Sequence, residues 1–270
     1  MKVFLSADME GISGIATEAM TEDSDKDYDR ARELMTGDVN AAIKGALAAG
    51  ATEVWTKDAH GDATNLLVER LQAPAQLIQG WNGPARMMEG VDESFAAALL
   101  IGYHARAMTD AGTLSHTMAG RVRGLWYNGV EVGESAISAA HAGYHGVPLV
   151  FASGDEALCA EVHQVIGLQV ETAAVKTAYA RECVCLLPVG EARRRIRDGV
   201  ARALARREEI PPFRPGTPIE VRLQFHRSVQ ARAASLVPTV QRLDDTTVAA
   251  TVDGGLAAAN LVAVLLDVTG

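Results

Sequence analysis

Short aliphatic runs alternate with helix-like stretches through residues 1–189, and this alternation constrains the fold more than any other feature. The runs that predict strands are Lys2–Ala7, Glu53–Thr56, Ala98–Gly102, Pro148–Ala152 and Val170–Val175. The stretches that predict helices are Arg30–Ala49, Ala63–Leu71, Gly133–Gly143 and Glu156–Ile166. Strands that are aliphatic on both faces and separated by helices are typical of a parallel sheet covered by helices. We therefore expect an α/β fold with a mostly parallel sheet.

The pattern changes near residue 190, where an arginine-rich helical stretch, Glu191–Glu209, is followed by a proline cluster. Proline does not continue a helix or an inner strand, so the cluster separates elements. The elements expected beyond it are the strands Ile219–Phe225 and Thr246–Val252 and the helices Ser228–Leu236 and Leu256–Asp267. The sequence thus predicts a first domain over residues 1–189 and a smaller α+β domain over 190–270. Within the first, Asn128-Gly129 predicts a hairpin with a type I′ turn.

Charge and composition exclude several classes of protein. The chain has 25 Lys and Arg against 34 Asp and Glu, a net charge of −9, which argues against a nucleic-acid partner. The sequence has neither a signal-peptide pattern at its start nor the roughly 20 apolar residues of a membrane span, so we expect a cytoplasmic protein that does not act at membranes. Cys159, Cys183 and Cys185 lack disulfide or zinc-ribbon spacing and are expected to be reduced thiols.

Metal-ligand side chains follow the predicted strands. They are Asp8 and Glu10 after the first strand, Asp58 and His60 after the second, His104 after the third and Asp155 after the fourth. The carboxyl ends of parallel strands share one edge of the sheet, where ligands bind. Asp8 and Glu10, two residues apart, point to the same side of an extended chain and repel each other unless a proton or cation lies between them.

Neutral imidazoles and carboxylates together form the usual ligand set of zinc. His60 and His104 lie at matching strand ends, opposite Asp8 and Glu10. Glu134, at the start of a predicted helix, could join them or could serve only the electrostatics of the first helical turn. His116 lies in a loop and could equally be a surface residue. The sequence therefore predicts a metal site at this sheet edge.

The chain resembles the DppA-type D-aminopeptidases, zinc peptidases once described as dipeptide transport proteins. The resemblance runs through most of the chain and is looser in the second domain. The motifs that carry it are Ser6-Ala7-Asp8-Met9-Glu10-Gly11-Ile12-Ser13-Gly14, Lys57-Asp58-Ala59-His60, Met88-Glu89-Gly90-Val91-Asp92, Gly102-Tyr103-His104-Ala105-Arg106-Ala107, Ser115-His116, Val132-Gly133-Glu134 and Ala173-Ala174-Val175-Lys176.

The resemblance implies a zinc-dependent aminopeptidase that hydrolyses short peptides, with D-amino acids at their N-terminus. It implies two Zn²⁺ ions per subunit, a catalytic role for His116, and a ring-shaped homodecamer in which the second domain serves assembly or a substrate channel. The implied zinc ligands are Asp8, which bridges the two ions, and Glu10, His60, His104 and Glu134. Whether His116 acts as nucleophile, general base or proton shuttle stays open, and Mn²⁺ or Co²⁺ could replace zinc in such a site.

Two other functions remain as alternatives at this stage. A metal-dependent phosphoesterase or deacylase can use the same ligands, although Arg106 is the only loop arginine near one of them. A non-catalytic peptide-binding protein is the second alternative. Such a protein is usually exported, and the sequence shows no signal peptide.

Overall fold

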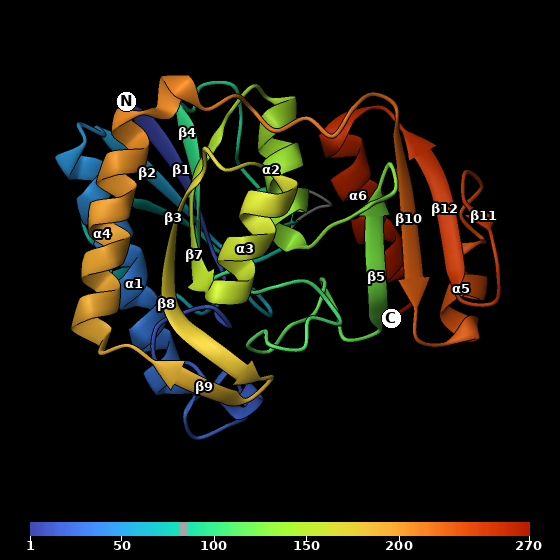
Figure 1. The fold of residues 1–270 in the computed structure, drawn as a ribbon, viewed down its shortest axis with the longest axis horizontal. Helices are drawn as coiled ribbons and strands as arrows, with labels where there is room; N and C mark the ends of the chain where they lie inside the picture. Colours follow the sequence, from blue (N-terminus) through green and yellow to red (C-terminus); the bar gives the residue numbers. More distant parts are fainter. Residues whose placement is uncertain (82–85) are drawn as a thin grey trace.

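The computed structural model describes residues 1–81 and 86–270, and its strands form two sheets (Figure 1). Sheet A has the strand order β3-β2-β1-β4-β7-β8-β9. Its neighbouring strands run parallel except for β9, which pairs antiparallel with β8. The strands are β1 (Lys2–Ala7), β2 (Glu53–Asp58), β3 (Gln76–Ile78), β4 (Ala97–Ile101), β7 (Leu149–Asp155), β8 (Glu171–Ala180) and β9 (Cys183–Leu186). The predicted α/β fold with a mostly parallel sheet is confirmed.

Helices cover both faces of sheet A, which explains why its strands are aliphatic throughout. Side chains alternate along β1, so Val3 and Leu5 lie in one core and Phe4 lies in another on the opposite face. The covering helices are α1 (Tyr28–Ala48) and α4 (Val189–Ala205) on the first face, and α2 (Glu134–Tyr144) and α3 (Glu156–Val165) on the second. None of the helices in residues 1–81 and 86–270 is both long and apolar enough to cross a bilayer.

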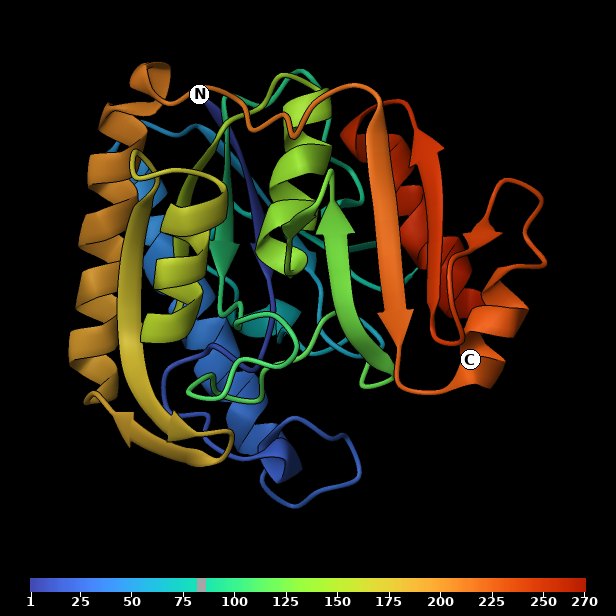
Figure 2. The same ribbon diagram turned by 45° about the vertical axis from the view of Figure 1, so that its right-hand side comes forward.

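Sheet B brings the middle of the chain beside its C-terminal part, as Figure 2 shows for the green β5 and the orange β10. Its strand order is β11-β12-β10-β5-β6, and all neighbours are antiparallel. The strands are β5 (Val122–Tyr127), β6 (Val130–Glu131), β10 (Ile219–Phe225), β11 (Gln241–Arg242) and β12 (Thr247–Val252). Helix α6 (Gly254–Asp267) lies in the core between sheet B and α2, and α5 (Ser228–Ala234) packs beside β10. Sheet B is therefore anchored to sheet A through α2.

The predicted hairpin with the turn Asn128-Gly129 joins β5 to β6. Both residues have positive φ, 49° and 81°, as a type I′ turn requires. The division of the chain into residues 1–189 and 190–270 stays a prediction. The sheets themselves draw on both sides of residue 190, because β5 and β6 belong to sheet B and α4 packs against α1.

The predicted helix over Ala63–Leu71 is wrong, since only a short 3₁₀ turn, Val68–Arg70, forms there. The carboxylate of Asp58 accepts hydrogen bonds from the backbone N–H groups of Asn65 and Leu66, at 2.6 and 2.7 Å. Ala63 has a φ of 62°, which an α-helix does not allow. The loop is thus organised by a buried acid, and β3, which the sequence did not indicate, follows it.

Candidate metal centre

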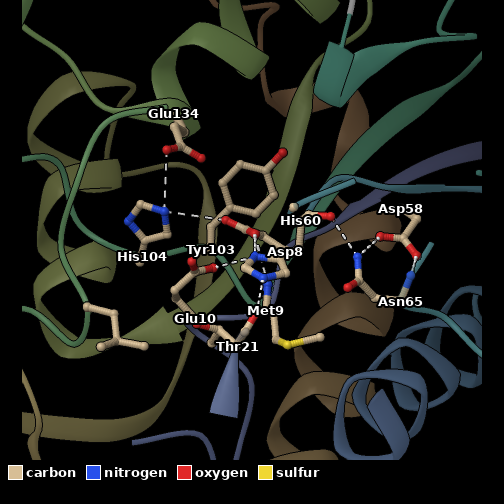
Figure 3. A network of polar contacts seen from close by, with 12 residues as sticks. Asp8, Met9, Glu10, Thr21, Asp58, His60, Asn65, Tyr103, His104 and Glu134 are labelled. Carbon is tan, nitrogen blue, oxygen red and sulfur yellow. Dashed lines mark hydrogen bonds and ion pairs between the residues drawn. The ribbon is translucent and has the colours of Figure 1, made fainter. Parts of the chain in front are cut away.

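The side chains expected to form the site lie together at the carboxyl edge of sheet A, and Figure 3 shows most of them. They are Asp8 and Glu10 after β1, His60 after β2, His104 after β4, His116 in the loop before β5, and Glu134 at the first residue of α2. Residues far apart in the sequence meet here because neighbouring parallel strands end at one edge.

Asp8, Glu10 and His60 form a first group of possible ligands. The Nδ1 atom of His60 lies 3.0 Å from Oε2 of Glu10 and 3.3 Å from Oδ1 of Asp8. One ligand atom from each residue lies within 4.8 Å of the other two. The two carboxylates are buried, with Asp8 only 3% and Glu10 only 6% exposed.

Asp8 also belongs to a second group, with His104 and Glu134. The Nε2 atom of His104 lies 3.4 Å from Oδ2 of Asp8 and 3.4 Å from Oε1 of Glu134. Figure 3 shows the imidazole of His104 between these two carboxylates. Each oxygen of Asp8 therefore faces a different group.

His116 lies against the second group. Its ring stacks on that of His104, with 4.0 Å between the centroids and 15° between the planes. Its Nε2 atom is 3.7 Å from Oε1 of Glu134, and it also forms a third possible ligand group with Glu10 and His104. The structure thus brings His116 to the cluster, although its loop position gave no sign of this.

A backbone carbonyl lies within hydrogen-bond distance of one ring nitrogen of each histidine. The contacts join His60 Nε2 to the oxygen of Thr21, His104 Nδ1 to that of Ala105 and His116 Nδ1 to that of Leu114, each at 2.9 Å. A carbonyl only accepts, so these nitrogens carry the proton and the other nitrogen of each ring faces the cluster. This is the arrangement that orients metal-bound histidines. Sequence reasoning missed these carbonyls, because a main-chain group leaves no sequence signal.

Burial and mutual repulsion shift the ionisation of the cluster. Burial raises the pKa of Asp8 to about 7, and the neighbouring Glu10 adds to the shift. Burial would also raise the pKa of Glu10, but His60 outweighs it and holds that pKa well below its usual value. Burial opposes the charged form of His60 and His104, yet Glu10 and Glu134 respectively hold their pKa values well above the usual range. The cluster thus holds protons that a cation would displace.

Three buried atoms of the cluster have no hydrogen-bond partner among the described residues: Asp8 Oδ2, Glu10 Oε2 and His104 Nε2. Buried polar atoms are rarely left unpaired, and where they are, an ion or water is a common reason. Carboxylate oxygens and imidazole nitrogens form a ligand set suited to zinc. The residues present therefore fit a metal ion.

All of the cluster except His104 lines a cavity of about 420 Å³. Its wall also includes Tyr28, Asp62, Trp81 and Arg86. The indole N–H of Trp81 donates to the oxygen of Gly61 at 2.7 Å, beside His60. A cavity of this size falls within the roughly 300–1,000 Å³ of small-molecule sites.

Asp58 and Asp155, the last residues of β2 and β7, organise loops and do not join the cluster. Asp58 binds Asn65, as Figure 3 shows. Asp155 caps α3 by accepting from the N–H of Leu158 at 2.8 Å, and accepts from the N–H of Thr113 at 2.6 Å. The cysteines form none of the ligand groups found in the described part of the chain.

Comparison with known proteins identifies the family. A family model described as D-aminopeptidase matches residues 1–264. The chain belongs to the D-aminopeptidase family. This membership confirms the predicted enzyme class, an aminopeptidase that hydrolyses peptide bonds.

Members of the family resemble the chain along nearly its whole length. A D-aminopeptidase of Bacillus subtilis (strain 168) is 37% identical over 247 residues, which cover 92% of this chain and 89% of the relative. A solved structure, described as the Zn-dependent D-aminopeptidase DppA from Bacillus subtilis, a self-compartmentalizing protease, matches with a TM-score of 0.96. The match covers 100% of this chain and 98% of the other, at 35% identity. The fold is therefore that of the family.

Gly11 provides a test of how tightly the loop that follows β1, residues 8–15, is packed. Its N–H donates to the oxygen of Gly102 at 2.8 Å, and an added Cβ would lie 1.9 Å from the oxygen of Tyr103. We expect Gly11→Ala to lower the free energy of unfolding by about 1–3 kcal/mol, measured by urea denaturation. Gly120→Ala, where a Cβ meets nothing within 4 Å, is the control and should stay within about 0.5 kcal/mol of the parent. Equal stability of the two variants would contradict the close packing.

Proposed function

We propose that the chain removes N-terminal residues, D-amino acids in particular, from short peptides by means of two zinc ions. The observation that carries the proposal is that two groups of ligand atoms share Asp8. Five ligand side chains are too many for one tetrahedral ion, whereas a shared carboxylate suits a pair. The family description and the zinc dependence of the solved relative support the same reading.

Each proposed zinc position has its own side chains. Asp8, Glu10 and His60 would hold one ion, and Asp8, His104 and Glu134 the other. When bound, the zinc pair supplies a Lewis acid for the scissile carbonyl and lowers the pKa of a water molecule. The protein's part is to keep these donors converged and the substrate in the cavity.

His116 is the proposed catalytic residue. The Leu114 carbonyl binds its Nδ1, so Nε2 is the atom that faces the cluster. The side chain is 24% exposed, against 1% for His104, so it can reach a substrate in the cavity. A neutral imidazole placed in this way can accept a proton at Nε2 and return it to the leaving amine. The same free Nε2 atom could also act as a nucleophile, so the geometry supports a catalytic role without selecting among the three.

A phosphoesterase fits the cavity less well. Phosphate substrates require cationic side chains, and the arginines near the site already have partners. Arg86 forms an ion pair with Asp267, and Arg106 lies between Glu131 and Glu161. A non-catalytic peptide-binding role is disfavoured by membership of an enzyme family.

Assembly into a ring-shaped homodecamer is also proposed. The solved relative is described as self-compartmentalizing, and the match to it extends over the entire chain, including sheet B. Sedimentation of the purified protein would measure the number of subunits. The cytoplasmic location stays a prediction.

The zinc content is the first test of the proposed function. We expect about two zinc ions per chain by elemental analysis, and His104→Ala should lose at least one of them with nearly all hydrolysis of D-aminoacyl p-nitroanilides. His226→Ala, at an exposed position, is the matched control and should keep both metal and activity. Full metal content in folded His104→Ala would contradict the ligand assignment.

The second test separates a catalytic from a metal-binding role of His116. We expect His116→Ala to keep its zinc while kcat falls by about 10²–10⁴-fold, the usual loss for a general acid or base. Metal content and kcat should be measured on the same preparation. Loss of zinc together with activity would make His116 a ligand, and wild-type turnover would remove it from the mechanism.

The third test uses the protons held by the metal-free cluster. Zinc requires ionised carboxylates and neutral imidazoles, so its binding releases protons, and its affinity should fall as the pH is lowered. Asp8, with a pKa of about 7, is protonated at pH 6 and ionised at pH 8. We expect more protons to be released per chain near pH 6 than near pH 8, measured calorimetrically in buffers of different ionisation enthalpy. Equal release at both pH values would contradict the raised pKa of Asp8.

A further inference from the structure

A buried lysine lies directly beneath the metal-ligand loop, and the proposed function makes no use of it. Lys176 belongs to β8, is only 2% exposed, and directs its ammonium group to the loop that follows β1. Its Nζ donates to three backbone carbonyls, those of Glu10 at 2.5 Å, Ile12 at 3.0 Å and Ile15 at 2.8 Å. One side chain thus binds the loop at three carbonyls, and the first of these belongs to Glu10, a proposed zinc ligand.

The three carbonyls converge on a single point, as they do around a metal cation. Oxygen dipoles arranged in this way repel one another unless a positive charge lies between them. The loop, residues 8–15, is neither helix nor strand, so regular main-chain hydrogen bonding does not hold it. Other anchors of the loop include the N–H groups of Asp8 and Gly11, which donate to the oxygens of Ile101 and Gly102, and Ser13, which donates to Asp38. The ammonium group therefore takes the place of an internal cation.

The geometry requires the charged form of the side chain. An ammonium has three N–H donors and a neutral amine has two, so only the ammonium serves all three carbonyls. The carboxylates of Asp155, Asp38 and Glu10 favour the charged form electrostatically. Asp155 lies opposite Lys176 in the β7–β8 pairing. The neighbouring carboxylates thus help to keep the charge.

We propose that Lys176 is a positioning residue for the metal centre, holding the loop so that the carboxylates of Asp8 and Glu10 converge. The inference rests on the proposed zinc site. Without the ammonium, three buried carbonyls would turn toward other donors, and the main chain of Glu10 would move with them. Residues that orient metal ligands typically contribute about 10–100-fold to metal affinity.

The test compares Lys176→Met with Lys44→Met, which removes an exposed lysine of α1. Zinc affinity is measured by competition with a chelator, and ligand geometry by the visible absorption of the Co²⁺-loaded protein. We expect Lys176→Met to bind zinc about 10–100-fold more weakly, to change the Co²⁺ spectrum, and to lose kcat at saturating zinc with KM nearly unchanged. Lys44→Met should match the wild type in all of these.

The outcomes separate this inference from the proposed function. Wild-type protein that binds no zinc would overturn both. Wild-type protein that binds zinc, together with folded Lys176→Met of equal affinity and identical Co²⁺ spectrum, would overturn only the role of Lys176. If Lys176→Met does not fold, Lys176→Arg replaces it, because arginine keeps the charge but cannot donate to three converging carbonyls from one atom. Unchanged zinc affinity in Lys176→Arg, or failure of both variants to fold, would assign the lysine to folding and overturn the proposal.

Discussion

Repulsion between buried carboxylates is the constraint on which the rest of the site depends. Asp8, Glu10 and Glu134 are almost completely buried, and their oxygens lie around the imidazoles of His60 and His104. Charges packed so closely in a poorly solvated place are stable only with positive charge between them. Protons on the histidines meet this need in the metal-free protein, and the proposed zinc ions meet it in the working enzyme. The fold around the site is organised to impose this crowding.

Several elements of the fold together hold the buried carboxylates and imidazoles close to one another. Neighbouring parallel strands deliver ligands to one sheet edge, α2 begins at Glu134, and backbone carbonyls set the orientation of the histidine rings. Lys176 binds the carbonyls of the ligand loop from below. Most of these restraints come from the main chain or from buried residues outside the cavity. The supports of the site therefore lie in the main chain and the core and not on the surface.

Elements with a repeating pattern could be predicted from the sequence, whereas those set by one contact could not. Helix α1 and strand β1 were predicted within two residues, because their apolar spacing is regular. The helix expected at Ala63–Leu71 was wrong because the carboxylate of Asp58 accepts hydrogen bonds from the backbone N–H groups of Asn65 and Leu66. The convergence of Asp8, Glu10, His60 and His104 at one sheet edge was predictable from topology alone. The position of His116 was not, since its loop folds back through tertiary contacts that leave no local pattern.

Sharing Asp8 between two ligand groups has a thermodynamic consequence. In a centre built in this way, the two positions would not fill independently, because an ion at one position changes the charge and placement of the carboxylate that it shares with the other. Linkage requires that each ion change the affinity for the second by the same factor in both directions. An ion that draws Asp8 toward itself and neutralises its charge alters the field and the geometry that the next ion meets. Loading of the proposed two-zinc centre would then be a cooperative event, and its half-filled form would be a distinct species with its own population at low metal concentration.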